Sequence, residues 1–309
     1  MARRRRGRPV SGILLLDKPL GLSSNHALQR VKRLFSAAKA GHTGSLDPLA
    51  TGVLPICFGE ATKFSQYLLD SDKSYDSTFL LGAATATGDA EGELVATGDA
   101  QQLQLAQIEE ALTAFRGAIE QTPPMYSAIK QDGQPLYKLA RQGVEVERKS
   151  RQITIHRYEV GAFREGPQAE LDVHIDCSKG TYIRSLAIDL GERLGIPAHV
   201  KVLRRTGVGP FRIDSCVSME TLQALSDSGD MAAMDALLKP VDEALAHIPL
   251  LKLPQSSGFY LRQGQPVLVP NAPCDGMVRV ALDTGEFLGL GEILADGRVA
   301  PRRLVASGR

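Results

Sequence analysis

The pattern of apolar positions near the start of the chain predicts a buried strand, a helix and a second apolar element. Segment 12–19, GILLLDKP, is a continuous apolar run ended by a proline, which is typical of a buried strand. In 23–39 the apolar residues recur at helical spacing, basic residues occupy the other face, and two serines at its start are N-cap candidates. Segment 53–59, VLPICFG, predicts a buried strand or the start of a helix.

The middle of the chain predicts further strands and two amphipathic helices. Segment 74–82 has strand-like composition, and 152–160 and 170–177 alternate apolar and polar residues, as half-buried antiparallel strands do. Helical spacing is found over 105–117 and 182–195, and we expect each of these helices to end at its last glycine.

Two changes in amino-acid composition divide the chain. Residues 123–151 are first proline-rich and then basic, so we expect an excursion from the core. Segment 247–258 is a candidate linker, because short strand-like runs and turn signals follow it. We therefore expect a basic N-terminal arm over 1–9, a large domain over 10–250 and a small β-rich domain over 251–309.

Composition is that of an ordinary globular protein. The 309 residues are 43% hydrophobic and 23% charged, and no apolar run is long enough for a membrane helix. The basic start is followed by too short an apolar run for a secretory signal, so we expect a cytoplasmic protein that does not enter a membrane. The four cysteines lie far apart without a CxxC pair, which predicts free thiols and no zinc site.

The net charge of +1 conceals local basic clusters. They lie at 3–8, 29–33, 201–205 and 300–304. Basic clusters on a nearly neutral chain suit a protein that binds a polyanion along one face, although each cluster alone is also consistent with ordinary solvated surface.

Several familiar chemistries lack their motifs. The sequence has no GxxxxGK[ST] loop, no HExxH and no GxSxG elbow, and its histidines lack metal-ligand spacing. The glycine pair in 289–294 lacks a third glycine and a βαβ context, so a dinucleotide site is not supported. We expect neither a metal nor a cofactor.

The stretch GHTGSLDPLATGVL, 41–54, concentrates polar groups in one expected loop. Asp47 precedes a proline, and three glycines, Gly44 among them, permit tight backbone paths that would fix its carboxylate. Local evidence leaves two interpretations of Asp47 open, a turn former and a catalytic group. His42 carries the same ambiguity.

Four separated segments resemble blocks of the bacterial tRNA pseudouridine synthase B family, TruB. They are LDKPLGLSSN, AGHTGSLDPLATGVLPICFGEATKF, KSYDSTFLLGAATATGDAEG and CSKGTYIRSLAIDLGERLG. PPMYSAIK, GQPLYKLARQG and DGRVAPRRLV extend the resemblance over nearly the whole chain. The resemblance implies an isomerase that converts the tRNA T-loop uridine at position 55 to pseudouridine. It also implies an α+β fold with a mixed, mainly antiparallel central sheet flanked by helices, an active site in a central cleft and a PUA-like C-terminal domain.

The resemblance also implies roles for single residues. Asp47 matches the catalytic aspartate, Arg184 the arginine that pairs with it, and Tyr75 a tyrosine against the target base. His42 matches the residue that enters the T-loop when the uridine is flipped out. The other matched positions near the substrate are Tyr182, Leu203, Lys18, Lys63 and Gly44.

The implied reaction suits a carboxylate without a cofactor. It breaks the N1–C1′ bond and joins C5 to C1′, with no redox change and no net hydrolysis. A carboxylate can act as a nucleophile or stabilise a cationic sugar. Attack at C1′, attack at C6 and a glycal route all remain open.

The basic part of 123–151 matches the family's RNA-gripping segment. The residues expected to face phosphate are Lys130, Lys138, Arg141, Arg148 and Lys149. The implied partner is the T-loop and T-stem of tRNA, and we expect a monomer without an obligate protein partner. Ser74 and Asp76 stand where the family often has a basic residue beside Tyr75, but strand alternation should point Asp76 to the opposite side.

Two other functions remain compatible with the same residues. One is a tRNA-binding and folding factor in which the modification is secondary, and the other is a glycosidase that releases free uracil. The RNA substrates beyond tRNA, the role of the arginine-rich arm and the oligomeric state stay open.

Overall fold

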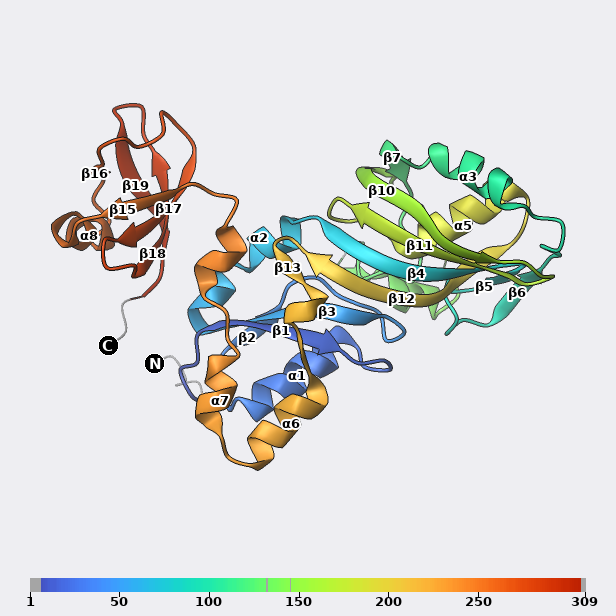
Figure 1. Ribbon diagram of the computed structural model, residues 1–309, viewed down its shortest axis with the longest axis horizontal. Coiled ribbons are helices and arrows are strands. Elements are labelled where there is room, and N and C mark those ends of the chain that lie inside the picture. The colour runs from blue at the N-terminus through green and yellow to red at the C-terminus, as the bar shows by residue number, and fades with distance from the viewer. Residues whose placement is uncertain (1–6, 132, 145, 307–309) are drawn as a thin grey trace.

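The computed structural model describes residues 7–131, 133–144 and 146–306, and Figure 1 shows two β-sheets of unequal size. The arginines at positions 3–6 lie outside the described residues. The larger sheet has ten strands. In order across the sheet, its main path is β14 (Val217–Ser218), β1 (Gly12–Lys18), β3 (Thr51–Phe58), β12 (Ala198–Val208), β4 (Lys73–Leu81), β11 (Ala169–Cys177), β10 (Arg151–Arg164) and β7 (Gly117–Gln121).

The large sheet is mixed and mainly antiparallel, as predicted. Along its main path only β1/β14 and β3/β12 run parallel. Two short strands lie off this path, β2 (Ala40–His42) against β3 and β13 (Phe211–Arg212) against β12. The parallel contact of β3 with β12 joins the two halves of the sheet, and the residues before β3 therefore come close to β12.

Helices cover the sheet in two groups (Figure 1). The first half of the sheet packs on α1 (Ser24–Leu34), α6 (Met219–Asp227) and α7 (Met231–Ala236), and the second half on α3 (Leu105–Thr113) and α5 (Ile183–Leu194). Buried and half-exposed residues alternate strictly along β4 and β11. The alternation predicted for 170–177 is thus confirmed, whereas the alternation predicted for 152–160 is interrupted by a bulge between Ile155 and Arg157 of β10 (Arg151–Arg164).

The predicted strands 12–19 and 74–82 are confirmed with small shifts of their ends. Segment 53–59, predicted as a strand or a helix start, belongs to β3 up to Phe58. Two predicted helices end early. The Ser23 side chain caps α1 as expected, yet the helix stops at Leu34, and Ser36 turns the chain with a φ of 46°. Gly117 does not end α3, which stops at Thr113. Gly117 opens β7 instead, because the Arg116 guanidinium binds the Tyr158 carbonyl of the neighbouring strand and draws the chain into the sheet.

The five-stranded C-terminal sheet agrees with the predicted β-rich region. Its order is β15 (Leu250–Leu253), β17 (Met277–Leu282), β18 (Phe287–Ile293), β19 (Arg298–Leu304) and β16 (Val267–Leu268). The predicted linker 247–258 is wrong, because it contains β15 and the start of α8 (Gln255–Arg262). Leu253 is fully buried and Leu251 packs against the same cluster, so part of this segment belongs to the core of the small sheet.

The two sheets meet through a small apolar cluster. Phe64, Leu245, Ile248 and Leu290 are buried together there. Beside them the Lys63 Nζ donates to the Leu304 carbonyl at 3.0 Å. The small sheet is therefore fixed against the segment that follows β3.

The remaining elements are short. They are η1 (Gly59–Lys63), α2 (Ser65–Asp70), β5 (Ala83–Thr85), β6 (Leu94–Thr97), β8 (Lys130–Gln131), β9 (Gln134–Pro135), α4 (Leu136–Ala140), η2 (Ile213–Ser215) and η3 (Val241–Leu245). The four cysteines are unpaired, as predicted. Of the helices in the described residues, none combines the length and apolar character needed to cross a bilayer.

Candidate active site

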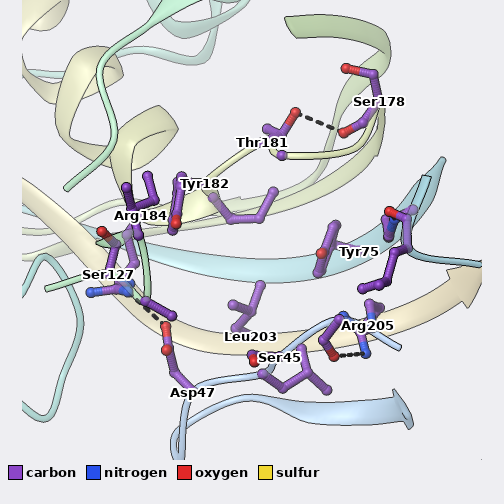
Figure 2. A pocket seen from close by; sticks show the side chains of 18 of the residues that line it. Ser45, Asp47, Tyr75, Ser127, Ser178, Thr181, Tyr182, Arg184, Leu203 and Arg205 are labelled. Atoms are coloured by element: carbon purple, nitrogen blue, oxygen red, sulfur yellow. Dashed lines mark hydrogen bonds and ion pairs between the residues drawn. The ribbon is translucent and has the colours of Figure 1, made fainter. Parts of the chain in front are cut away.

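A pocket of about 390 Å³ opens where β4, β12 and the start of α5 meet the loop 43–50 (Figure 2). Its size falls in the range of small-molecule sites. Six of the residues singled out from the sequence line it: Gly44, Asp47, Tyr75, Tyr182, Arg184 and Leu203. Residues 127–129 line it too, so the first part of 123–151 reaches the site instead of leaving the core.

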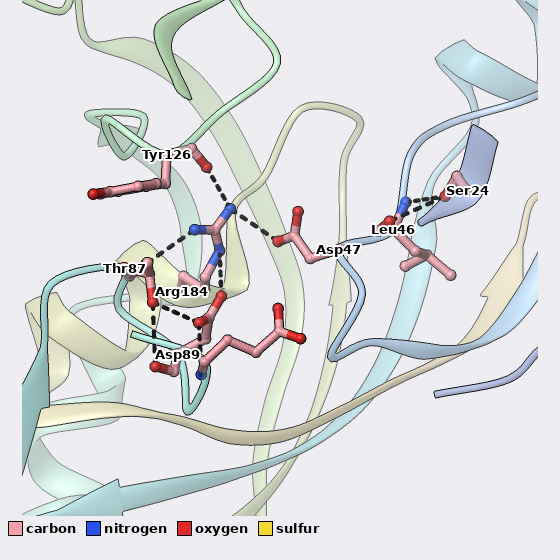
Figure 3. Close-up of polar contacts among 8 residues, drawn as sticks. Ser24, Leu46, Asp47, Thr87, Asp89, Tyr126 and Arg184 are labelled. Atoms are coloured by element: carbon pink, nitrogen blue, oxygen red, sulfur yellow. Dashed lines mark hydrogen bonds and ion pairs between the residues drawn. The ribbon is translucent and has the colours of Figure 1, made fainter. Parts of the chain in front are cut away.

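The loop that carries Asp47 is tied down on both sides. The Ser24 Oγ accepts from the Leu46 N–H at 2.7 Å and donates to the Leu46 carbonyl at 3.1 Å (Figure 3). The Pro48 carbonyl accepts from Gly21 N–H at 2.9 Å, and the Asp47 carbonyl accepts from Ala50 N–H at 3.0 Å. Asp47 is thus held by backbone contacts to α1 and to the chain before it.

Gly52, at the end of this loop, lets β3 approach β12. It lies opposite Arg205 in the parallel pairing and has a φ of 102°. A Cβ at this position would lie 2.1 Å from the Arg205 carbonyl oxygen. Any side chain here would push β3 and β12 apart.

Arg184 joins Asp47 to three other residues, which belong to two segments (Figure 3). Its Nη2 lies 2.9 Å from Asp47 Oδ2 and also donates to the Tyr126 carbonyl at 2.7 Å. Its Nη1 donates to the Thr87 carbonyl at 2.9 Å, and its Nε lies 3.6 Å from Asp89 Oδ2. The guanidinium is buried between two carboxylates, and its charge is balanced by both.

The two carboxylates differ in exposure. The side chain of Asp89 is 5% exposed, whereas that of Asp47 is 44% exposed although Arg184 holds one of its oxygens. Burial raises the pKa of the Asp47 carboxyl, Arg184 and Lys18 oppose this, and Asp89 adds to it. The net effect is a raised pKa on a carboxylate that is fixed yet open to the pocket.

Tyr75 and Arg205 form the other end of the pocket. They are directly opposed residues of β4 and β12, and both line the pocket. Arg205 also donates to the Val53 carbonyl at 2.8 Å and to the Gly44 carbonyl at 3.2 Å. Burial raises the pKa of Tyr75, and the charge of Arg205 opposes that rise.

The basic residues of the cluster 201–205 do not share one surface. Lys201 pairs with Glu170, and Arg204 pairs with Asp17 at 2.7 Å on the face away from the pocket. Arg205 is 1% exposed. The alternation of β12 sends adjacent arginines to opposite faces, which a count of charges along the chain does not reveal.

Of the two lysines expected near the substrate, Lys18 lies close to Asp47 and Lys63 lies outside the pocket lining. Lys18 is fully buried, and its Nζ donates to the Leu22 carbonyl at 2.6 Å. Burial lowers the pKa of Lys18 to about 8, and the nearby Asp47 opposes this. Lys63 does not line the pocket and pairs instead with Glu60 at 2.7 Å, beside the small sheet.

Tyr182 lies in the pocket and His42 outside its lining. The backbone of Tyr182 is held by Gln121, whose side chain binds both its N–H and its carbonyl, and its ring lies under the Arg151 guanidinium at 4.8 Å. His42 lies on β2, and within the described residues its buried Nδ1 has no partner. Burial lowers the pKa of His42, which favours the neutral ring.

The basic residues of 123–151 are mostly exposed. Lys130, Lys138, Arg141 and Lys149 are exposed, and Arg141 also lies over the Tyr137 ring at 5.7 Å. Arg148 is half-buried and donates to the Pro123 carbonyl at 3.1 Å. This hydrogen bond joins the two ends of the segment 123–151.

Sequence reasoning missed Asp89, Arg205 and Lys73 as site residues. Asp89 and Lys73 lie in KSYDSTFLLGAATATGDAEG, one of the segments that resemble the family, and this resemblance could have identified them. Lys73 is a buried lining residue whose Nζ donates to the Leu69 carbonyl at 2.7 Å. Asp76 is placed as expected, on the opposite side from Tyr75 and 2.7 Å from His174 Nδ1.

No group of three or more histidine, cysteine or acidic side chains that could hold a metal ion occurs in the described part of the chain. The chemistry available in the pocket includes one accessible carboxylate, two phenols and two buried guanidinium groups. Such a set can stabilise charge of both signs at opposite ends of a bound molecule.

Family models cover most of the chain. Residues 32–183 match the model described as TruB family pseudouridylate synthase (N terminal domain). Residues 184–246 match tRNA pseudouridylate synthase B C-terminal domain, and residues 249–305 match Pseudouridine synthase II TruB, C-terminal.

Curated relatives and solved structures agree with these matches. The chain is 56% identical over 300 residues to tRNA pseudouridine synthase B of Pseudomonas aeruginosa (strain UCBPP-PA14), covering 97% of each chain. It is 54% identical over 298 residues to the protein of that name from Coxiella burnetii (strain Dugway 5J108-111), covering 96% of each. A structure titled "Crystal Structure of a Cbf5-Nop10-Gar1 Complex" matches with a TM-score of 0.71 at 23% identity, covering 100% of this chain and 90% of that one. That last likeness concerns the fold.

Proposed function

The chain belongs to the TruB family of pseudouridine synthases, and from this premise we propose that it isomerises the T-loop uridine of tRNA, at position 55, with Asp47 as the catalytic carboxylate. One observation carries the proposal. The Asp47 carboxylate is 44% exposed in a pocket of about 390 Å³ while Arg184 holds it at 2.9 Å. A carboxylate that is both fixed and accessible is what reaction at a ribose carbon requires.

The pocket walls suit a flipped uridine. Tyr75, Tyr182 and Leu203 offer ring and aliphatic surfaces for the base, and Asp47 lies at the end where the sugar would enter. The N1–C1′ bond breaks, the base turns, and C5 bonds to C1′ and loses its proton. Because the product is an isomer of the substrate, no cofactor is part of the proposal.

RNA binding is assigned to the surfaces around the pocket. The neutral ring of His42 on β2 is proposed to fill the space that the flipped nucleotide leaves, since a flat neutral ring stacks on bases. The exposed cations Lys130, Lys138 and Lys149 are proposed to contact phosphates. The small sheet, which begins near the expected boundary at 250, is proposed to contact tRNA beyond the T-loop.

The test uses unmodified tRNA without added metal or cofactor. Pseudouridine is mapped by nucleotide position, and intact RNA is weighed by mass spectrometry. We expect pseudouridine in the T-loop and an unchanged RNA mass. Absence of T-loop pseudouridine overturns the substrate assignment, and release of free uracil assigns the pocket to a glycosidase.

Asp47→Asn tests the carboxylate, with Asp76→Asn as the matched control on the opposite face of β4. The Asp47 variant should lose pseudouridine formation and keep tRNA affinity, whereas the control should keep both. Conversion at the normal rate by the Asp47 variant removes this residue from the mechanism. Loss of affinity together with activity would show that the substitution disturbs binding instead.

A further inference from the structure

Arg205 is a buried cation whose contacts in the described part of the chain are all uncharged. It is 1% exposed. Its N–H groups donate to the Val53 and Gly44 carbonyls, and it lies directly opposite Tyr75 in the sheet. Burying a guanidinium without a carboxylate is costly, so such an arrangement persists where the charge has a use.

The position of Arg205 connects three parts of the site. Gly44 and Val53 lie on either side of the loop that carries Asp47, and Arg205 binds the carbonyls of both. The register of β12 places Arg205 directly opposite Tyr75 on β4. One side chain thus binds the carbonyls on both sides of the loop that carries Asp47 and lies opposite Tyr75.

Charge is distributed unequally along the pocket. Asp47 and Asp89 flank Arg184 at one end, with Glu91 and Lys18 close by, so three carboxylates meet two cations there. Arg205 and the buried Lys73 lie at the Tyr75 end, and no acidic side chain pairs with Arg205 in the described part of the chain. The pocket therefore has a negative end beside Asp47 and a positive end behind Tyr75.

We propose that Arg205 is a positioning residue that acts through Tyr75 to stabilise the negative charge that develops on uracil as the N1–C1′ bond breaks. The inference rests on the proposed function. The electron pair of that bond stays on the uracil ring, spread over N1 and the two carbonyl oxygens, while C1′ becomes electron-poor beside Asp47. The later bond from C5 to C1′ returns a pair to the sugar, and the C5 proton moves to N1, so atoms and electrons balance.

The cation opposite Tyr75 polarises its phenol. A phenolic hydroxyl has one hydrogen to donate, and Tyr75 can donate it to the base. A donor polarised by an adjacent cation binds an anionic acceptor more strongly than a neutral one. The stabilisation therefore grows as bond cleavage proceeds, which is the condition for lowering a barrier.

The test compares uridine with 5-fluorouridine at the target position of a T-arm RNA under single-turnover conditions. Fluorine withdraws electrons and stabilises the uracil anion, so cleavage depends less on help from the protein. The readout is the rate at which the target nucleoside disappears from digested RNA. Arg205→Met removes the charge at similar length, and Tyr75→Phe breaks the connection at its other end.

We expect Arg205→Met to slow uridine conversion about 10- to 100-fold, in line with the loss of a preorganised donor. The factor by which it slows 5-fluorouridine conversion should be at least about threefold smaller. Tyr75→Phe should show the same dependence on the substrate, and the double variant should be no worse than the more impaired single one. RNA affinity should stay within about threefold. Arg204→Met, which alters the adjacent arginine on the opposite face, is the matched control and should leave both rates unchanged.

Equal losses on the two substrates overturn the proposal, because a merely structural role does not depend on the leaving group. If Arg205→Met fails to fold, Tyr75→Phe decides by the same comparison. Failure of the unaltered protein to convert uridine would instead overturn the proposed function. The two failures are therefore distinguishable.

Discussion

Replacing Arg184 with glutamine should shift the acid limb of the pH–activity profile to higher pH. The reactive form of Asp47 is the carboxylate, whose pKa burial already raises and Arg184 opposes. Removing the guanidinium leaves only the charge of Lys18 to oppose burial and Asp89, so the pKa of Asp47 rises further. A larger share of the protein then holds a protonated, inactive Asp47 below the new limb.

The size of the effect follows from the ion-pair distance of 2.9 Å. Unit charges at that distance attract by about 1.4 kcal/mol in water and about 6 kcal/mol at an effective dielectric of 20. The side chain of Asp47 is 44% exposed, so solvent screens the pair and the lower part of this range applies. A loss of about 1–3 kcal/mol corresponds to a roughly 5- to 150-fold lower kcat/KM on the acid side.

The assay measures kcat/KM for tRNA from pH 5.5 to 9. Arg184→Lys serves as the control, because it keeps a positive charge beside Asp47 and should retain part of the activity at low pH. We expect the loss in Arg184→Gln to shrink as the pH rises. A loss of equal size at every pH would refute the electrostatic reasoning and leave Arg184 as a support for the Tyr126 and Thr87 carbonyls alone.

Three further predictions concern stability and RNA affinity. Gly52→Ala should lower the free energy of unfolding in urea by about 2 kcal/mol or more, since its Cβ would lie 2.1 Å from a carbonyl oxygen. Gly41→Ala is the control, because a Cβ there meets open space, and an equal loss in both variants would contradict the argument. Leu190→Ala, at a fully buried position of α5, should cost about 2–5 kcal/mol in the same assay, and a cost below about 1 kcal/mol would contradict its place in the core. Lys138→Ala should weaken tRNA binding and lower the slope of log Kd against log salt by about 1, and an unchanged slope would remove this residue from the phosphate contacts.

Alternation along single strands was predictable from the sequence. The pattern of β4 places Tyr75 in the pocket and Asp76 on the opposite face, where Asp76 meets His174. The match of short blocks likewise pointed to Asp47 and Arg184, which the structure brings together at 2.9 Å. Both inferences depend on local spacing or on a motif, which the linear sequence contains.

Pairing between distant strands was not predictable in this way. Arg205 looked like part of a surface cluster because its burial depends on the register of β12 against β3 and β4. Gly117 and the segment 247–258 carry local signals for a helix end and a linker, yet packing against neighbouring strands draws both into sheets. Tertiary contacts override local preference where buried apolar or hydrogen-bonded neighbours are available.

The ties on the loop 43–50 have a thermodynamic consequence. Its backbone is anchored through Leu46 and Pro48, and Arg205 binds the Gly44 carbonyl. Fixing each residue of a free loop costs about 1–2 kcal/mol of conformational entropy. In this protein the loop is ordered when the chain folds, before RNA binds. In the proposed reaction the carboxylate is therefore already in place when RNA arrives, and the ordering that remains on each encounter is that of the RNA.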